Sequence, residues 1–236
     1  MARTAPRSAV AGDDTAIRLW DVTDPNEPAA LTTLDDPRDY VYATTFSADG
    51  RLLAAGSGDK KTWLWNVEDR RRPVKLGELH GHRQEVYSVA IDPRARLLAA
   101  GSADKTIQLW DIAGRPRRLG KPLTGPNNTV YWLDFSPDGH TLAAGGGDGT
   151  VWLWDVRDPA RPVTYATLAG GSSAVWMVSF GPGGRLLSAG GADATVRLWT
   201  TDPERVAREL CALAGDPLTA AEWERYLPDV PHDPPC

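Results

Sequence analysis

The stretch VYSVAIDPRARLLAAGSADKTIQLWDI, residues 86–112, contains three short strand signals separated by turn residues. The last of them, TIQLWDI at 106–112, alternates in character as a half-buried strand does, because successive side chains of a strand point to opposite faces. The segment RLLAAGS at 96–102 is typical of a short buried strand ending in a hairpin, and VYSVAIDPRA at 86–95 is typical of a third strand. This stretch therefore predicts consecutive antiparallel strands.

The same arrangement recurs along the chain at one period. A Leu-Trp dipeptide closes every copy, at Trp20, Trp65, Trp110, Trp154 and Trp199, and these tryptophans are separated by 45, 45, 44 and 45 residues. A weaker fourth segment follows three of the copies, at 73–79, 117–123 and 162–168, and its Pro and Arg content suits an outer edge strand. Four antiparallel strands in each copy of about 45 residues are typical of the blade of a β-propeller.

These patterns predict an all-β fold, a β-propeller of four-stranded antiparallel blades. About five blades are expected, in a partial or open ring, followed by a short C-terminal α-helical cap. Residues 1–200 would form the propeller and residues 201–236 a helical tail. Three repeats are whole, at about 40–79, 85–123 and 129–168, whereas the first lacks an inner strand and the last lacks an outer strand.

The period, the turn signals and the terminal dipeptide together resemble the WD-repeat family over residues 7–200. The resemblance implies a structural hydrogen-bond network that joins a turn Asp, the His of a Gly-His pair, a hydroxyl and the strand Trp. The Asp is present six residues before every repeat Trp, at Asp14, Asp59, Asp104, Asp148 and Asp193, whereas only His82 follows a Gly in the expected place. We therefore expect a complete network in at most one blade, and a structural role for His82.

The two ends of the repeat array raise the question of closure. The resemblance implies a ring of seven blades that closes by sharing one blade between the termini, and five blades with these ends do not close in that way. The chain is then the C-terminal part of a larger propeller, an open arc of five blades, or a piece that completes itself by association. In each case unpaired terminal blades would allow self-association.

The last 36 residues depart from the repeat. Pro203 at a helix start and apolar residues at helical spacing predict a first helix up to about Ala214, and a capping box at Thr219 and Glu222 predicts a second helix through Leu227. This tail is either a cap over the exposed edge of the last blade or a separate partner-binding helix. Cys211 and Cys236 both lie in it, and they are either bridged or, as we expect, free.

The pattern LTxxEWxRYLP at 218–228 resembles the end of many actinobacterial WD-repeat proteins that carry an N-terminal signalling module, a STAND-type NTPase or a protein kinase. This resemblance implies a truncated relative, or the sensor end of such a signalling protein. Neither a Walker motif nor a kinase motif occurs in the sequence.

The composition excludes several partners. A formal net charge of -5 disfavours nucleic acid and anionic membranes, since binding to phosphates requires an excess of Lys and Arg. We find no signal peptide and no apolar run long enough to span a bilayer, and two cysteines are too few for a disulfide framework. We therefore expect a cytoplasmic protein.

Candidate catalytic chemistry is weak throughout the sequence. The glycine-rich stretch 145–149 joins two strands and is typical of a hairpin rather than of a phosphate-binding loop. His80 and His82 lack further metal ligands at convincing spacing, and the sequence contains no GxSxG motif. We expect no enzyme activity, no metal and no cofactor.

A better candidate is the first two alternating positions of each inner strand, which the resemblance places at the top rim of the central channel. These positions hold Tyr40 and Tyr42, Glu85 and Tyr87, Thr129 and Tyr131, and Ala174 and Trp176. The recurring aromatic either contacts a partner or packs between blades. Our leading hypothesis is a scaffold that binds a protein or peptide here. The alternative is a propeller enzyme or a lectin-like binder of small ligands, for which the rim offers mainly Glu85.

Overall fold

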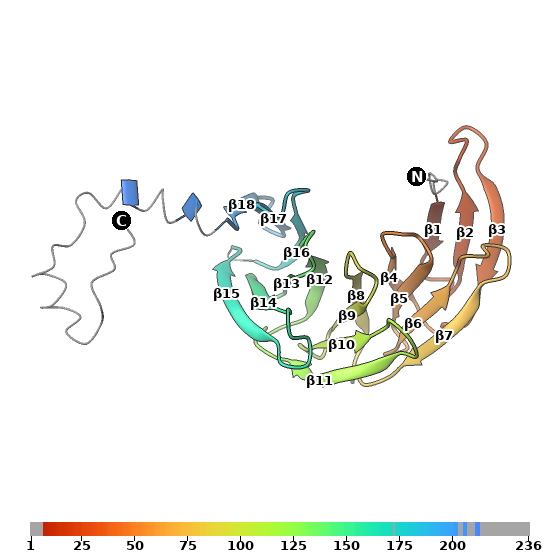
Figure 1. Cartoon of the computed structure of the whole chain (residues 1–236), viewed down its shortest axis with the longest axis horizontal. Helices are drawn as coiled ribbons and strands as arrows, with labels where there is room; N and C mark the ends of the chain where they lie inside the picture. Colours follow the sequence, from red (N-terminus) through yellow and green to blue (C-terminus); the bar gives the residue numbers. More distant parts are fainter. Residues whose placement is uncertain (1–6, 172, 203–204, 207–210, 213–236) are drawn as a thin grey trace, which may run out of the picture.

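The computed structural model describes residues 7–171, 173–202, 205–206 and 211–212. In this part of the chain, eighteen strands form five antiparallel sheets that follow one another along an open arc (Figure 1). The prediction of an all-β chain with four-stranded antiparallel sheets, five sheets in all and no closed ring, is confirmed. The predicted helical cap falls almost entirely outside the described residues.

Three sheets have four strands each, in the order inner to outer. Their strands are β4 (Val41–Phe46), β5 (Leu52–Ser57), β6 (Thr62–Asn66) and β7 (Val74–Leu79); β8 (Val86–Ile91), β9 (Leu97–Ser102), β10 (Ile107–Asp111) and β11 (Arg117–Leu123); and β12 (Val130–Phe135), β13 (Thr141–Gly146), β14 (Thr150–Asp155) and β15 (Val163–Ala169). In Figure 1 the strands β7, β11 and β15 follow the outside of the arc.

The two terminal sheets have three strands each among the described residues. The first contains β1 (Arg7–Ala11), β2 (Ile17–Asp21) and β3 (Ala29–Leu34), and the last contains β16 (Val175–Phe180), β17 (Leu186–Gly191) and β18 (Val196–Thr200). Alignment with the complete sheets shows that, among the described residues, the first sheet has no inner strand and the last has no outer strand. The sequence analysis expected both of these strands to be missing.

Neighbouring sheets are held together by a repeated contact between a glycine and a valine. A Cβ atom placed on Gly56 would lie 2.8 Å from Val86 Cγ1, one on Gly101 would lie 2.6 Å from Val130 Cγ1, and one on Gly145 would lie 3.0 Å from Val175 Cγ1. In β5, β9 and β13 this glycine is therefore a socket, and the first valine of the next inner strand fills it; the first sheet has Ala11 at the aligned position. Close packing of this kind leaves no room for an added methyl group.

Around each socket lies an apolar cluster shared by two sheets. Between the second and third sheets, for example, Leu64 of one packs with Leu98 and Trp110 of the other. The same arrangement occurs at the other three junctions, so the repeat tryptophans Trp65, Trp110 and Trp154 are fully buried against the preceding sheet. The large apolar side chains that stabilise the fold therefore lie between blades.

The outward face of the last sheet lacks this cover. Gly190 aligns with the three socket glycines, yet a Cβ atom there would meet nothing within 4 Å. Val196 and Leu198 flank this position and are 75% and 67% exposed. The described residues therefore end on an apolar face with an empty socket.

Two further observations concern the chain as a whole. Cys211 forms a disulfide, so the expectation of a free thiol at this position is wrong; Cys236, the sequence's other cysteine, lies outside the described residues. Within those residues we find no helix that is long and apolar enough to cross a membrane.

Candidate functional site

Every inner strand has a β-bulge at its second residue. In each case the pairing with the second strand skips one residue, and the skipped residue is always aromatic: Tyr42, Tyr87, Tyr131 and Trp176. A bulge leaves its extra residue outside the ladder and changes the direction of that side chain, which is why bulges are frequent at barrel rims and binding sites. We call these four residues the rim aromatics.

Three of the rim aromatics form a continuous row across three sheets. The rings of Tyr42 and Tyr87 are stacked, with centroids 4.5 Å apart and planes at 25°. Tyr87 and Tyr131 meet edge to face at 5.7 Å and 78°, and Tyr40 extends the row at 6.3 Å from Tyr42. Both geometries are favourable for aromatic pairs.

Not all rim positions join this row. Trp176 has no ring partner among the described residues and is 56% exposed. Glu85, Thr129 and Ala174 occupy the place that Tyr40 has in the second sheet, and all three are partly buried. The structure therefore brings Tyr40, Tyr42, Tyr87 and Tyr131 together, whereas Trp176 stands apart from that row.

The predicted turn aspartates fix the loops that lead into the inner strands. Oδ2 of Asp59 accepts the backbone N–H of Arg38 at 3.1 Å, and Oδ2 of Asp104 accepts that of Arg83 at 2.8 Å. Asp148 accepts the N–H of Asn127 in the same way at 2.6 Å. Each of these bonds joins residues 21 positions apart in the sequence. The aspartates therefore hold in place the loops that precede the rim aromatics.

The third sheet contains the histidine network that the sequence predicted for at most one blade. Nδ1 of buried His82 lies 3.0 Å from Asp104 Oδ2, and its Nε2 lies 3.2 Å from the carbonyl oxygen of Ala100. Burial alone would raise the pKa of Asp104, but hydrogen bonds from His82, Thr106 and the Arg83 amide outweigh it and hold the pKa well below its ordinary value. His82 is therefore bonded on both ring nitrogens, and its contact with Asp104 helps to hold the loop that precedes β8.

The second and fourth sheets, which lack the histidine, have a second tryptophan, which the sequence analysis missed. Trp63 Nε1 donates to Asp59 Oδ2 at 3.1 Å, and its ring stacks on that of Trp65 at 6.2 Å. Trp152 stacks on Trp154 at 5.9 Å in the fourth sheet. The signal was available, because Trp-Leu-Trp occurs only in units that lack the Gly-His pair.

In the two terminal sheets an arginine contacts the turn aspartate. Arg18 lies 2.6 Å from Asp14, and Arg197 lies 2.9 Å from Asp193. These four side chains lie at or near the surface. The turn Asp is therefore contacted by histidine in the third sheet, by tryptophan in the second and by arginine in the first and last. In the fourth sheet Trp152 donates instead to Thr150 Oγ1 at 2.7 Å, and that hydroxyl donates to Asp148.

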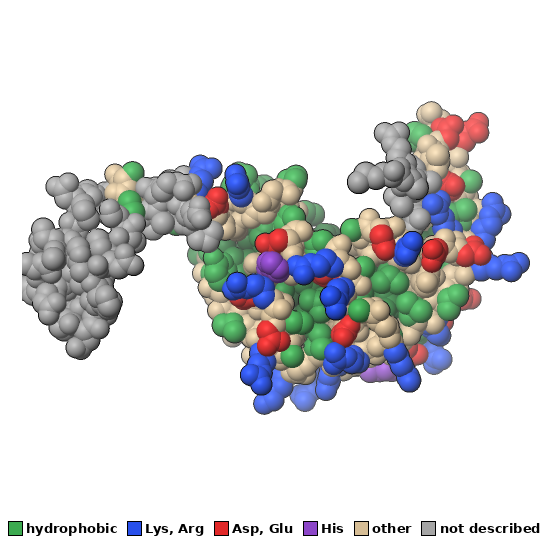
Figure 2. Space-filling model, viewed as in Figure 1, with side chains coloured by type: hydrophobic (Ala, Val, Ile, Leu, Met, Phe, Trp, Pro, Cys, Tyr) green, Lys and Arg blue, Asp and Glu red, His purple; other side chains and the backbone are tan. Residues whose placement is uncertain are grey.

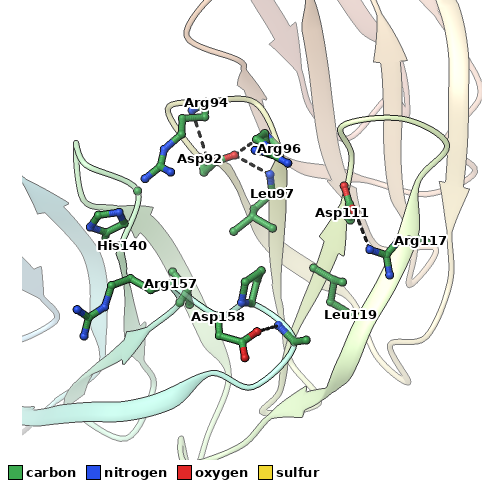
Figure 3. A pocket seen from close by; sticks show the side chains of 14 residues that line it. Asp92, Arg94, Arg96, Leu97, Asp111, Arg117, Leu119, His140, Arg157 and Asp158 are labelled. Atoms are coloured by element: carbon green, nitrogen blue, oxygen red, sulfur yellow. Dashed lines mark hydrogen bonds and ion pairs between the residues drawn. The ribbon is translucent and has the colours of Figure 1, made fainter.

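A second candidate site is a pocket of about 370 Å³ on the side of the arc seen in Figure 3, between the hairpins of the third and fourth sheets. Asp92 accepts the backbone N–H groups of Arg94, Arg96 and Leu97, and Arg117 pairs with Asp111 at 2.9 Å. Acidic and basic side chains are likewise interspersed over the face in Figure 2. Guanidinium groups and carboxylates are mixed in the lining of this pocket, so its charges select no class of ligand.

Among the described residues no three His, Cys, Asp or Glu side chains lie close enough together to hold a metal ion. A row of aromatic rings on the inner strands, exposed at Tyr40 and Tyr42 and partly buried at Tyr87 and Tyr131, is therefore the best-defined site among the described residues. Fold and site together define a repeat protein of propeller type.

Comparison with known families gives the particular class. Four segments match the family described as WD domain, G-beta repeat, at residues 29–66, 73–111, 117–155 and 163–200. They cover more than half of the chain, which therefore belongs to the WD-repeat family. No curated protein matches the chain. The repeats indicate a protein-interaction scaffold.

The matched segments are offset from the sheets. Each begins in the outer strand of one sheet and ends in the third strand of the next; the first, for example, runs from β3 to β6. Four matched repeats therefore extend over five sheets, and each repeat covalently joins two neighbouring blades.

Proposed function

We propose that the chain is a non-catalytic scaffold that binds a protein or peptide through the rim aromatics. The single observation that carries this proposal is the bulge that recurs at Tyr42, Tyr87, Tyr131 and Trp176. An aromatic ring can be buried without being the extra residue of a bulge, because Trp65 and Trp154 are buried although the register shifts beside them place the extra residue in the outer strand. The bulge instead directs one aromatic per blade away from the ladder.

Exposure supports a binding role over packing between blades. Tyr42 is 41% exposed, although it already stacks on Tyr87. Large amphipathic aromatic side chains held in a fixed position contribute much of the binding free energy at protein interfaces, and they lose little conformational entropy on binding. The alternative, a propeller enzyme or lectin-like binder, has only the carboxylates of Asp39 and Glu85 near the start of the inner strands in its favour.

The tail resemblance supports a place in bacterial signalling. We propose that residues 1–200 are the propeller and that residues 201–236 are a helical tail, and that the chain is the sensor or regulatory end of a signalling protein. The net charge of -5 supports a protein partner rather than nucleic acid or an anionic membrane surface. We propose a cytoplasmic location; the disulfide at Cys211 argues against it, because disulfides persist mainly in oxidising compartments.

A binding experiment tests the rim. The intact chain, immobilised, should recover a partner from extracts of its source cell, and the double variant Tyr87→Ala, Trp176→Ala should lose it, because two of the four rim aromatics are removed. Tyr165→Ala on the outer strand β15 is the matched control. Tyr165 is as exposed as Trp176, but it lies on the opposite edge of its sheet from the inner strand. Equal recovery by all three proteins would show that the partner does not bind through the rim aromatics.

A second proposal concerns the open face of the last sheet. We propose that this face mediates self-association, because Val196 and Leu198 are exposed around the empty socket at Gly190. Contiguous apolar surface of this kind commonly marks an interaction site. Contact with the first sheet of a second copy would repeat without closing, so it predicts a series of oligomers rather than one dimer.

A further inference from the structure

We propose that the free edge of β1 binds an extended segment of a partner protein, which pairs with β1 as the inner strand that the first sheet lacks among the described residues. The segment would carry a branched apolar residue followed by an aromatic one, as all four inner strands of this chain do at their start. This inference does not depend on the rim aromatics. Its basis is a set of contacts that recurs in the other sheets and that the first sheet offers unfilled.

A turn between the second and third strands of each sheet holds the start of the inner strand. The second residue of this turn donates its N–H to the carbonyl oxygen just before the first valine of the inner strand, at 2.8–3.0 Å. The donors and acceptors are Gly58 and Tyr40, Ala103 and Glu85, Gly147 and Thr129, and Ala192 and Ala174. Asp13 has the aligned position in the first sheet, and its N–H has no acceptor among the described residues. The first sheet therefore keeps this donor without the strand that it holds elsewhere.

The turn aspartate provides a second contact of the same kind. In three sheets it accepts the backbone N–H of the residue three positions before that valine, at Asp59, Asp104 and Asp148. The aligned Asp14 accepts no N–H from such a loop among the described residues, and its carboxylate contacts Arg18 instead. Asp14 is exposed, whereas Asp193 of the last sheet, which also pairs with an arginine, is partly buried. This acceptor in the first sheet is therefore accessible to an added segment.

The side chain of Val10 supplies apolar surface for the added strand to bury. Val10 is 53% exposed, whereas the aligned alanines are at most 4% exposed, at Ala55, Ala100, Ala144 and Ala189. In those sheets the alanine lies directly opposite the fourth residue of the inner strand, which is Thr44, Val89, Leu133 or Val178. An added strand would place a branched side chain beside Val10, and cross-strand pairs of this kind stabilise a sheet.

A second chain is the source that we propose for this strand. The inner strands β4, β8, β12 and β16 are all paired in their own sheets, and β1 is the edge of the first sheet (Figure 1). An unpaired edge presents a row of N–H and C=O groups. Extended peptides that add to such an edge gain affinity from backbone hydrogen bonds and specificity from alternate side chains. The ligand is therefore a strand-forming peptide segment rather than a folded surface.

Titration of the intact chain with a fluorescent peptide tests this inference. The peptide has the sequence of residues 81–91, because in the third sheet this segment makes both of the contacts described above. Two further versions are methylated on alternate backbone nitrogens, one in each phase. We expect one phase to weaken binding at least about tenfold and the other to change it less than about twofold, because only one edge of an added strand faces β1. Equal effects of the two phases, or no binding of the unmodified peptide, would overturn the proposal.

A matched pair of variants assigns the peptide to the first sheet. Asp13 is the second residue of a turn closed by the Thr15 N–H and the Gly12 carbonyl at 3.4 Å, a position that accepts proline. Asp13→Pro removes the carboxylate and the N–H, and it should weaken peptide binding about threefold to tenfold. Asp13→Ala removes the carboxylate alone and should leave the affinity within about twofold. Equal affinities of the two variants would contradict the contact with the Asp13 N–H.

A further variant separates this edge from the open face of the last sheet. Val196→Thr, Leu198→Ser should bind the peptide as tightly as the native chain does, and lost binding would place the peptide on the last sheet and end the proposal. Unchanged thermal melting should show that each variant is folded. Asp13→Pro should still recover a partner through the rim aromatics, so the two proposals fail in different experiments.

Discussion

The fourth and fifth sheets present the same face of the repeat in two different situations. Val151 and Leu153 on β14 are 0% and 3% exposed because the fifth sheet covers them, whereas the aligned Val196 and Leu198 on β18 are 75% and 67% exposed. Gly145 is filled by Val175, and the aligned Gly190 is empty. The repeat therefore specifies two complementary faces, and which residues form the core depends on whether a neighbour is present.

The largest expected difference between the two faces comes from the leucine pair. Leu153→Ala should lower the free energy of unfolding by about 2–5 kcal/mol, because it leaves a cavity between two sheets. Leu198→Ala should change it by less than about 0.5 kcal/mol, since that side chain is mostly exposed. Urea unfolding of both variants measures the difference. Equal losses would mean that the outward face of the last sheet is also covered.

The socket glycines give the next largest effect. Gly101→Ala should destabilise the protein by about 1–3 kcal/mol, because the added methyl group would lie 2.6 Å from Val130 Cγ1. Gly190→Ala should be neutral or slightly stabilising, as nothing lies within 4 Å and alanine loses less backbone entropy on folding. Thermal melting of the two variants measures this difference in stability. A lowered melting temperature for Gly190→Ala would show that another group fills the space beside Gly190.

The turn aspartates extend the comparison to polar contacts. Asp104→Asn should cost about 1–3 kcal/mol at pH 7, because His82 and the Arg83 amide lose a charged acceptor in a partly buried network. Asp193→Asn in the last sheet should cost less, since its bonds to Thr195 and Arg197 are exposed.

The same aspartate predicts a dependence on pH. Because the folded pKa of Asp104 is depressed, its contribution is complete above the unfolded pKa and declines as the pH falls below about 4. The stability difference between the native chain and Asp104→Asn should therefore narrow between pH 5 and about pH 3. A constant difference would contradict the assigned contacts of Asp104.

Changes on the open face of the last sheet should have the smallest effect on folding stability but a clear effect on self-association. The double variant Val196→Thr, Leu198→Ser should leave the melting temperature nearly unchanged but reduce concentration-dependent oligomers in sedimentation velocity, because it makes the open face polar. The pair Val163→Thr, Tyr165→Ser on the outer strand β15 is the control, with similar exposure. A chain that remains monomeric at high concentration would end the proposal of self-association.

Much of the fold could be predicted from the sequence, for a physical reason. The Leu-Trp period and the turn signals are local, so they predicted five blades, three complete repeats and the missing strands at the two ends. The bulges could not be predicted, since strict alternation along the strand would pair Tyr42 with a residue of β5. Only the observed pairing of Val41 with Ser57 and of Ala43 with Gly56 shows that Tyr42 is an extra residue.

For the candidate site, the sequence could not show how the predicted rim residues are arranged. The rim residues were identified from their recurrence, whereas the stacking of Tyr42 on Tyr87 depends on the angle between two sheets. The roles of Trp63 and Trp152 were missed because the expected network had histidine at that place. The contribution of the socket glycines was also missed, because a glycine in a strand does not indicate by itself what approaches it.

The offset between matched repeats and sheets has a consequence for how such genes change length. Because each repeat starts in one sheet and ends in the next, duplication or loss of one repeat by unequal crossing-over lengthens or shortens the arc by one blade and leaves both end faces as they were. Each duplicated unit also brings one bulged aromatic. If these aromatics bind a partner as we propose, the number of repeats would set how many of them the arc presents.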